Sequence, residues 1–116
     1  MGEIHLEEME FYSYHGHFKE ERIVGNKFLV DLILETDMRT PSASDSLEDA
    51  LNYQEAYMIV KREMNKKSYL LENIAHRIVE SVCNELPGII HATVKIRKMN
   101  PPVGGKMRAV SVTLSR

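Results

Sequence analysis

The sequence is poor in features that would point to a secreted or membrane protein. Only one of its 116 residues is cysteine, so no disulfide can form within the chain, as is usual for proteins of a reducing compartment. No hydrophobic run approaches the about 20 residues of a membrane-spanning helix, and the first residues, MGEIHLEE, lack the positive charge and apolar stretch of a signal peptide. These absences predict a cytoplasmic protein with no membrane partner.

A surplus of positive charge is also missing. The chain has 15 Lys and Arg residues and 17 Asp and Glu residues, for a formal net charge of −2. Nucleic acids are bound by clustered basic side chains, so we expect no nucleic-acid partner. The sequence has no repeat, linker or low-complexity tract, and 43% hydrophobic content fits a single domain over residues 1–116.

Two N-terminal segments alternate hydrophobic and polar residues, as half-buried strands do. In residues 4–11 the alternation changes phase, which predicts a β-bulge near Glu7 and Glu8 in a strand that continues to Tyr14. In residues 27–37 the alternation keeps its phase. The predicted buried face of this second strand consists of Phe28, Val30, Leu32 and Leu34.

Two helices are predicted in the middle of the chain, after the polar stretch TPSASDS. Asn52 followed by Glu55 has the spacing of a capping box and predicts a helix that begins at Tyr53. Ser68 is predicted to cap a second helix, whose hydrophobic residues recur at helical spacing until the Pro-Gly pair at 87–88 ends it.

Residues 89–98 and 107–115 alternate again, on either side of an NPPVGG turn. The resulting order predicts an α+β domain, ββααββ, with a four-stranded antiparallel sheet and two helices on one face. Such a sheet leaves two edges and one face uncovered, and closing it into a barrel with neighbouring copies protects the edges. We therefore expect a homo-oligomer.

Four motifs run nearly the length of the chain in the order FYSYHG, DSLEDALNY, LLENIA and KMNPP. Together they resemble the dihydroneopterin aldolase family. The resemblance implies the tunnelling fold, in which subunit sheets close into a barrel with the helices outside, commonly as an octamer of stacked tetrameric rings. It also implies a lyase of folate biosynthesis that cleaves 7,8-dihydroneopterin, a small pterin, to 6-hydroxymethyl-7,8-dihydropterin and glycolaldehyde by a retro-aldol reaction. The resemblance is also compatible with an accompanying C2′ epimerase activity.

The resemblance assigns the catalytic roles to Lys98, Tyr53 and Glu21. Lys98 and Tyr53, with a bound water, would transfer the protons, and Glu21 would help to place them. The C6=N5 imine of the substrate can take up the electrons, so neither a metal nor a lysine Schiff base is needed, and no cofactor is expected.

The resemblance assigns substrate binding to Glu72, Leu71, Leu51 and Tyr53. A carboxylate in the first turn of a helix, beside free backbone N–H groups, complements the donors and the carbonyl of a pterin ring. The family arrangement places Tyr53 in a pocket whose Glu72 and Lys98 come from a neighbouring subunit. Ala50, Leu51 and Met99 depart from the residues usual in the family, so the fine substrate contacts are expected to differ.

Each of these residues also has a purely structural interpretation. Lys98 alone is a solvated lysine at a strand end, and Glu72 alone is an ordinary carboxylate at a helix N-terminus. Tyr53 alone is an amphipathic residue at a helix start. Glu21 belongs to a charged segment, KEER, where Glu20 is easily mistaken for it.

A zinc enzyme of the same fold is one alternative. His15 and His17 resemble the HGH metal pair of the pyruvoyl-tetrahydropterin synthase group, and residues at i and i+2 of an extended segment point to the same side. The sequence offers no clear third ligand, and the motif residues Glu21, Tyr53 and Lys98 would be unexplained. Only His5 precedes the pair, and the other candidate ligands, His76, Cys83 and His91, lie in segments typical of core or surface.

Two further alternatives share the pterin site. An epimerase of dihydroneopterin triphosphate would need a basic cluster near the mouth of the pocket, for which the candidates are Lys95, Arg97, Lys106 and Arg108. A non-catalytic pterin-binding ring is expected to have lost Tyr53 or Lys98, and both are present.

Overall fold

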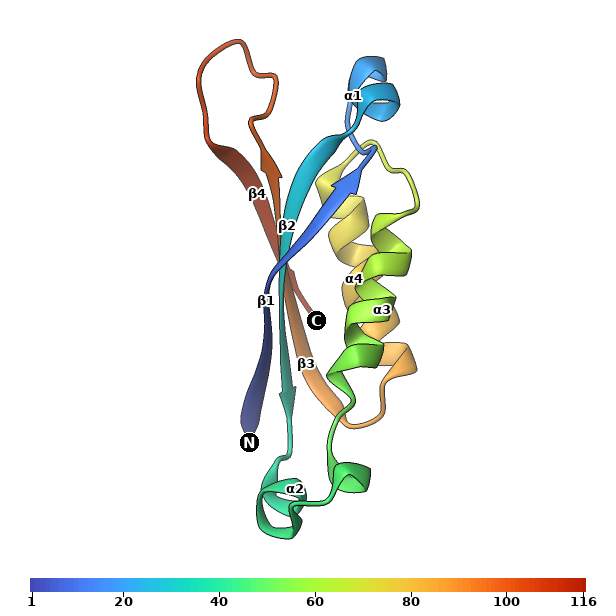
Figure 1. Ribbon diagram of the computed structural model, residues 1–116, viewed down its shortest axis with the longest axis vertical. Coiled ribbons are helices and arrows are strands. Elements are labelled where there is room, and N and C mark those ends of the chain that lie inside the picture. The colour runs from blue at the N-terminus through green and yellow to red at the C-terminus, as the bar shows by residue number, and fades with distance from the viewer.

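The computed structural model describes all 116 residues and contains one sheet of four antiparallel strands. The strands follow the chain order across the sheet: β1 (Gly2–Ser13), β2 (Asn26–Thr36), β3 (Ile89–Met99) and β4 (Ala109–Ser115). Two helices, α3 (Tyr53–Met64) and α4 (Leu71–Glu85), connect β2 to β3 and cover one face of the sheet (Figure 1). The predicted α+β class and the ββααββ order of the main elements are confirmed.

Three short helical segments were not predicted. They are α1 (Lys19–Val24), α2 (Arg39–Ser44) and the 3-10 turn η1 (Leu47–Asp49). None of them contains a buried residue, so none has the hydrophobic periodicity that reveals a helix in a sequence. Most of the polar stretch TPSASDS, residues 40–46, folds as α2, and η1 follows directly after it.

The hydrophobic core lies between the sheet and the two long helices. Phe28, Val30, Leu32 and Leu34 of β2 are all fully buried, which confirms the predicted face. Helix α4 packs against β3 and β4, and α3 packs against β1. Each fully buried side chain of this size stabilises the fold by about 1.5–3 kcal/mol relative to an exposed one.

The predicted bulge in β1 is confirmed. The pairing of β1 with β2 shifts register between Leu6 and Met9. Glu8 has a positive φ of 50° there, and its backbone N–H donates to Asp31 Oδ1 at 2.7 Å. The Asp31 carboxylate thus accepts a backbone N–H that, because of the bulge, has no partner in the neighbouring strand.

The N-terminus of α3 is capped as predicted, and that of α4 is not. Asn52 Oδ1 accepts the N–H groups of Gln54 and Glu55, so the Asn52 half of the predicted capping box is formed. The prediction for Ser68 is wrong, because α4 begins at Leu71 with Leu70 as its N-cap and has no side-chain cap. The Ser68 hydroxyl instead donates to Asn73 Oδ1 at 2.7 Å.

The chain is elongated, with extents of 53 × 24 × 20 Å. In Figure 1 the upper end carries α1, the start of α4 and the loop between β3 and β4, and the lower end carries α2 and the start of α3. Strands β1 and β4 are the two edges of the sheet. No helix has the length and hydrophobicity required to cross a bilayer.

Candidate active site

Lys98 and Glu21 form an ion pair at the upper end of the molecule. Lys98 Nζ lies 3.0 Å from Glu21 Oε1, and each side chain is 11% exposed. Lys98 comes from the end of β3, where it pairs with Phe28 of β2, and Glu21 comes from α1. Lys98 is therefore a largely buried, paired lysine and not a solvated one. Its partner is Glu21, whereas the neighbouring Glu20 is exposed.

The segment before α1 encloses the carboxylate of Glu21. Glu21 Oε2 accepts the backbone N–H of Phe18 at 3.2 Å. Gly16 packs directly against this side chain, and a Cβ added at Gly16 would lie 2.6 Å from Glu21 Cδ. Arg22 Nη1 donates to the carbonyls of Gly16 and His17 at 3.0 and 2.8 Å, which holds the segment closed. The motif FYSYHG contains Gly16, but the part played by Arg22 had no indication in the sequence.

The N-terminus of α4 lies at the same end of the molecule. Gly16 N–H donates to Ser68 O at 3.0 Å, which joins the segment of Gly16 to the turn before α4. Glu72, in the first turn, is exposed, and its side chain makes no hydrogen bond or ion pair within the chain. The backbone N–H groups of Leu71 and Glu72 have no acceptor within the chain. A ligand at this end would therefore meet a carboxylate and free N–H groups together.

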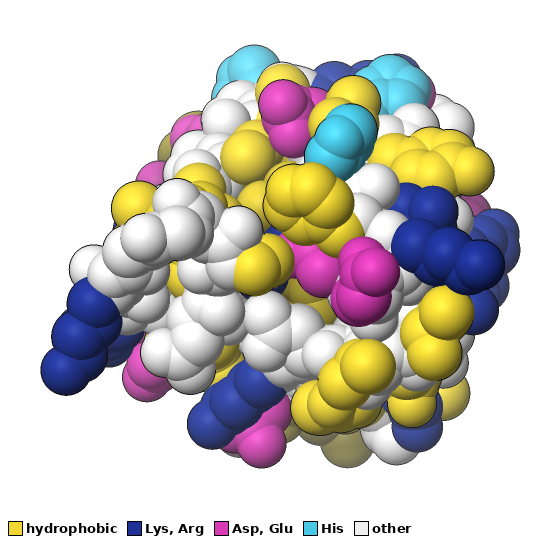
Figure 2. Space-filling view, turned by 90° about the horizontal axis from the view of Figure 1, so that it is seen from above, with side chains coloured by type: hydrophobic (Ala, Val, Ile, Leu, Met, Phe, Trp, Pro, Cys, Tyr) yellow, Lys and Arg dark blue, Asp and Glu magenta, His cyan; other side chains and the backbone are white.

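The upper end is hollowed between hydrophobic side chains. Figure 2 looks onto it and shows acidic side chains near the centre, with hydrophobic ones around them. The hollow has a volume of about 510 Å³ and extends from Phe18 and Glu21 of the α1 segment to Asn100 and Pro102 after β3. Phe18 and Val24, which also line the hollow, are 51% and 66% exposed. The hollow is also lined by Glu20, Gly25 and Asn26, whereas Lys98 and Glu72 are not among its lining residues.

Tyr53 and Leu51 lie at the other end of the molecule. They line a separate hollow of about 460 Å³ beside Thr36 and α2. Phe28, the partner of Lys98, and Thr36 are eight positions apart on β2, which corresponds to about 27 Å at the usual strand rise. One chain thus brings Lys98, Glu21 and Glu72 to one end and does not bring Tyr53 or Leu51 to them.

His15 is a core residue with both ring nitrogens engaged. Nε2 lies 2.7 Å from Met64 O and Nδ1 lies 3.1 Å from the backbone N of Ser68, so Nε2–H donates and Nδ1 accepts. Burial lowers the pKa of His15 to about 4. His17 is exposed, so the pair does not converge on a metal site. No group of three His, Cys, Asp or Glu side chains is arranged to hold a metal ion.

The four basic residues considered for a triphosphate are not gathered around this hollow. Lys95 and Arg97 line a different hollow, on the uncovered face of the sheet. Arg97 is paired there with Asp31, at 2.6 Å. Lys106 and Arg108 are exposed in the loop between β3 and β4.

Comparisons with known proteins match nearly the full length of the chain. The family model described as dihydroneopterin aldolase (FolB) matches residues 4–115. The dihydroneopterin aldolase of Streptococcus pyogenes serotype M1 is 42% identical over 117 residues, covering 100% of this chain and 98% of its own length. That of Bacillus subtilis is 36% identical with the same coverage. The crystal structure of the E. coli enzyme in complex with neopterin is similar in fold, with a TM-score of 0.91 and 20% identity over 100% of this chain and 99% of that one.

Proposed function

The chain belongs to the dihydroneopterin aldolase family, and from this premise we propose how its residues carry out the reaction. Its activity is that of a dihydroneopterin aldolase, a lyase of folate biosynthesis. The main support for the roles of these residues is the ion pair of Lys98 and Glu21. It lies at the same end of the molecule as the N-terminus of α4, which has no side-chain cap.

The pterin ring binds to the N-terminus of α4 in this proposal. The carboxylate of Glu72 accepts the N–H donors of the pyrimidine ring, and the free N–H of Leu71 donates to the ring carbonyl. Three features support this assignment: the exposure of Glu72, its lack of a partner and the missing side-chain cap. The bound neopterin of the E. coli relative is a ligand of this chemical class.

Lys98 is the proton-transfer group in this proposal. Removal of the proton from the 2′-hydroxyl breaks the C1′–C2′ bond, glycolaldehyde leaves, and the electron pair moves into the C6=N5 imine to give an enamine. Protonation of the enamine at C1′ then yields 6-hydroxymethyl-7,8-dihydropterin. Lys98 and Tyr53 act with a bound water as acid and base, and Glu21 fixes the position of the ammonium group. The reaction uses neither a metal nor a covalent lysine adduct.

Each site is shared between two subunits in this proposal. Tyr53 and Leu51 are about 27 Å from Lys98 along the sheet of one chain, so a second copy must supply them. The open edges β1 and β4 and the exposed hydrophobic residues at both ends support assembly into a ring. An octamer of stacked tetrameric rings, with the subunit sheets closed into a barrel, is the assembly that we propose, in the cytoplasm.

The proposal is tested by giving the purified protein 7,8-dihydroneopterin and its triphosphate separately. We expect 6-hydroxymethyl-7,8-dihydropterin and glycolaldehyde from the free substrate, because no basic cluster lines the hollow beside Glu21. Chromatography of the same reactions measures any C2′ epimer. EDTA and borohydride should leave turnover unchanged. Covalent trapping of substrate on a lysine by borohydride, or preference for the triphosphate, would contradict the proposal.

A further inference from the structure

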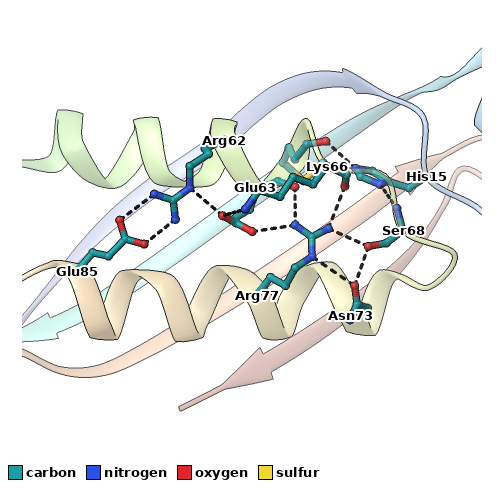
Figure 3. Close-up of polar contacts among 9 residues, drawn as sticks. His15, Arg62, Glu63, Lys66, Ser68, Asn73, Arg77 and Glu85 are labelled. Atoms are coloured by element: carbon teal, nitrogen blue, oxygen red, sulfur yellow. Dashed lines mark hydrogen bonds and ion pairs between the residues drawn. The ribbon is translucent and has the colours of Figure 1, made fainter.

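We propose that Arg77 is a positioning residue of the active site, which fixes the N-terminus of α4 for pterin binding. The inference rests on the proposed function, because it concerns the same site. Arg77 lies in α4, and the proposed ligand contacts do not include it. Its side chain is 21% exposed and faces the turn between α3 and α4 (Figure 3).

Arg77 makes its contacts with both ends of that turn. Nη1 donates to Glu63 O and Glu63 Oε1 at 2.8 and 2.9 Å, at the end of α3. Nη2 donates to Lys66 O at 3.0 Å and to Ser68 Oγ at 2.8 Å, and Nε donates to Asn73 Oδ1 at 3.3 Å. The planar guanidinium group therefore holds the turn at several points in a fixed geometry, which a lysine ammonium cannot reproduce.

The contact to Asn73 directly affects the proposed pterin site. Asn73 follows Glu72, and its side chain also accepts the hydroxyl of Ser68 at 2.7 Å. Since α4 has no side-chain cap of its own, Arg77, Ser68 and Asn73 are the side chains that secure its first turn. The direction of the free N–H groups and of the Glu72 carboxylate depends on this first turn.

The same turn is bonded to the segment that encloses Glu21. Ser68 donates its N–H to His15 Nδ1 and accepts the N–H of Gly16 at its carbonyl oxygen. Gly16 in turn packs against the Glu21 side chain. Arg77 thus directly contacts the first turn of α4, where the pterin is proposed to bind. It is linked to Lys98 only indirectly, through Ser68 and then through the segment of Gly16 and Glu21. We expect a loss of Arg77 to affect pterin affinity more than the chemical step.

Arg62 offers a matched control within the same ion cluster. It bonds to Glu63 Oε2 at 2.8 Å and to Glu85, but not to the turn or to Asn73 (Figure 3). Glu63 is buried, with a side chain 3% exposed. Burial alone would raise the pKa of its carboxyl, but pairing with three cations, Arg62, Arg77 and Lys66, outweighs this and keeps the pKa below the usual range. Loss of either arginine removes one of these cations, but only loss of Arg77 releases the turn.

The test compares Arg77→Lys with Arg62→Lys in the full-length assembled protein, well below the melting temperature of each. Fluorescence titration with 6-hydroxymethylpterin gives the Kd, and single-turnover rates at saturating 7,8-dihydroneopterin give the chemical step. We expect Arg77→Lys to raise Kd about tenfold, as a small misplacement of binding groups does, with the single-turnover rate within threefold of wild type. Arg62→Lys should change neither quantity more than twofold.

Equal affinity of the two variants, or a rise below threefold for Arg77→Lys, would overturn the inference. If Arg77→Lys does not assemble, Ser68→Ala takes its place. It removes the hydroxyl that accepts from Arg77 and donates to Asn73, so that only the longer direct bond from Arg77 Nε to Asn73, at 3.3 Å, remains, and it leaves the ion cluster intact. Ser68→Ala is expected to raise Kd in the same direction, and an unchanged Kd would overturn the inference. Failure of the proposed function is distinguishable, since the wild-type protein and Arg62→Lys would then fail to bind the pterin as well.

Discussion

Lys98 and Glu72 lie at the same end of the molecule but differ in their surroundings. The Lys98 ammonium group is largely buried and paired with Glu21, whereas the Glu72 carboxylate is exposed and has no partner. A buried, paired ammonium group is fixed for a proton transfer, whereas a free carboxylate at a helix N-terminus is available to a ligand. The two residues should therefore contribute to different steps.

Substitution of Glu72 and Lys98 should separate binding from chemistry. We expect Glu72→Ala to weaken affinity for a product-like pterin by a few kcal/mol, about the cost of leaving a charge-assisted pair unmade. Lys98→Ala should leave that affinity within about tenfold and lower turnover by roughly 10² to 10⁴, the usual contribution of a positioned acid or base. Pterin fluorescence and single-turnover kinetics measure both quantities, and normal turnover by Lys98→Ala would refute the mechanism.

Gly16 should matter for turnover because of the side chain that it lacks. A Cβ at this position would overlap the Glu21 carboxylate and lie 2.7 Å from Glu21 Cβ, so Gly16→Ala should push the carboxylate away from Lys98. We expect kcat to fall about tenfold or more, because a displaced group near the chemistry is costly. Gly105→Ala is the matched control, since an added Cβ there has no atom within 4 Å. Equal kcat values for the two variants would contradict the prediction.

Among the elements, the end of β1 and the turn between α3 and α4 are joined through His15. Its ring donates to Met64 O, accepts from the N–H of Ser68 and contacts Phe28 edge-on, with ring centroids 5.3 Å apart. Protonation would place a hydrogen on Nδ1, which could then no longer accept the N–H of Ser68. The neutral ring is therefore the form that the fold requires.

Acid should weaken this junction. The pKa of His15 is about 4 in the fold and 6.5 when unperturbed, so the unfolded chain binds the proton more readily between these pH values. The stabilisation is complete above pH 6.5 and is lost as the pH falls towards 4, by at most about 3 kcal/mol. Urea unfolding at fixed protein concentration, at pH 7.5 and 4.5, measures this loss. His15→Asn should reduce the loss, and His17→Asn, at an exposed position, should not. An unchanged loss in His15→Asn would contradict the prediction.

The elements that could be predicted from sequence are those with a local signature. The alternation in β2 and the cap at Asn52 involve residues a few positions apart, and both predictions are confirmed. The prediction that Ser68 caps α4 is wrong because its N–H donates to His15, 53 positions away, and its hydroxyl donates to Asn73. The ion pair of Lys98 and Glu21 joins residues 77 positions apart. The motifs could indicate these two residues, but only the fold brings them together.

At the scale of the whole molecule, the two halves of the proposed site lie at opposite ends of an elongated chain. The elements that hold Lys98, Glu21 and Glu72 are the end of β3, α1 and the start of α4, which meet at the upper end in Figure 1. Tyr53 begins α3 and Leu51 precedes it, at the lower end. A contact between unlike ends of identical chains is heterologous and closes into a ring when the rotation between neighbours permits. Variants that damage different ends should therefore complement one another.

Mixing Tyr53→Phe and Lys98→Ala subunits under conditions that allow exchange should restore activity. With random mixing of equal amounts, about a quarter of the sites combine an intact Tyr53 with an intact Lys98. A mixture of Glu72→Ala with Lys98→Ala is the control and should gain no turnover over the average of the two separate variants, because both residues come from the same end of one chain. Steady-state turnover after confirmed exchange is the measurement. Activity that remains at the level of the separate variants in the first mixture would exclude shared sites.

In the proposed assembly, the distance between Tyr53 and Lys98 along the sheet also determines how the number of complete active sites depends on the number of subunits joined. With each site built from two neighbours, a lone subunit has no complete site, and an open row of subunits has one site fewer than it has chains. Only closure of the ring gives every chain a site. Specific activity should therefore drop on dilution at the protein concentration where rings dissociate, which makes turnover a direct reporter of the quaternary equilibrium.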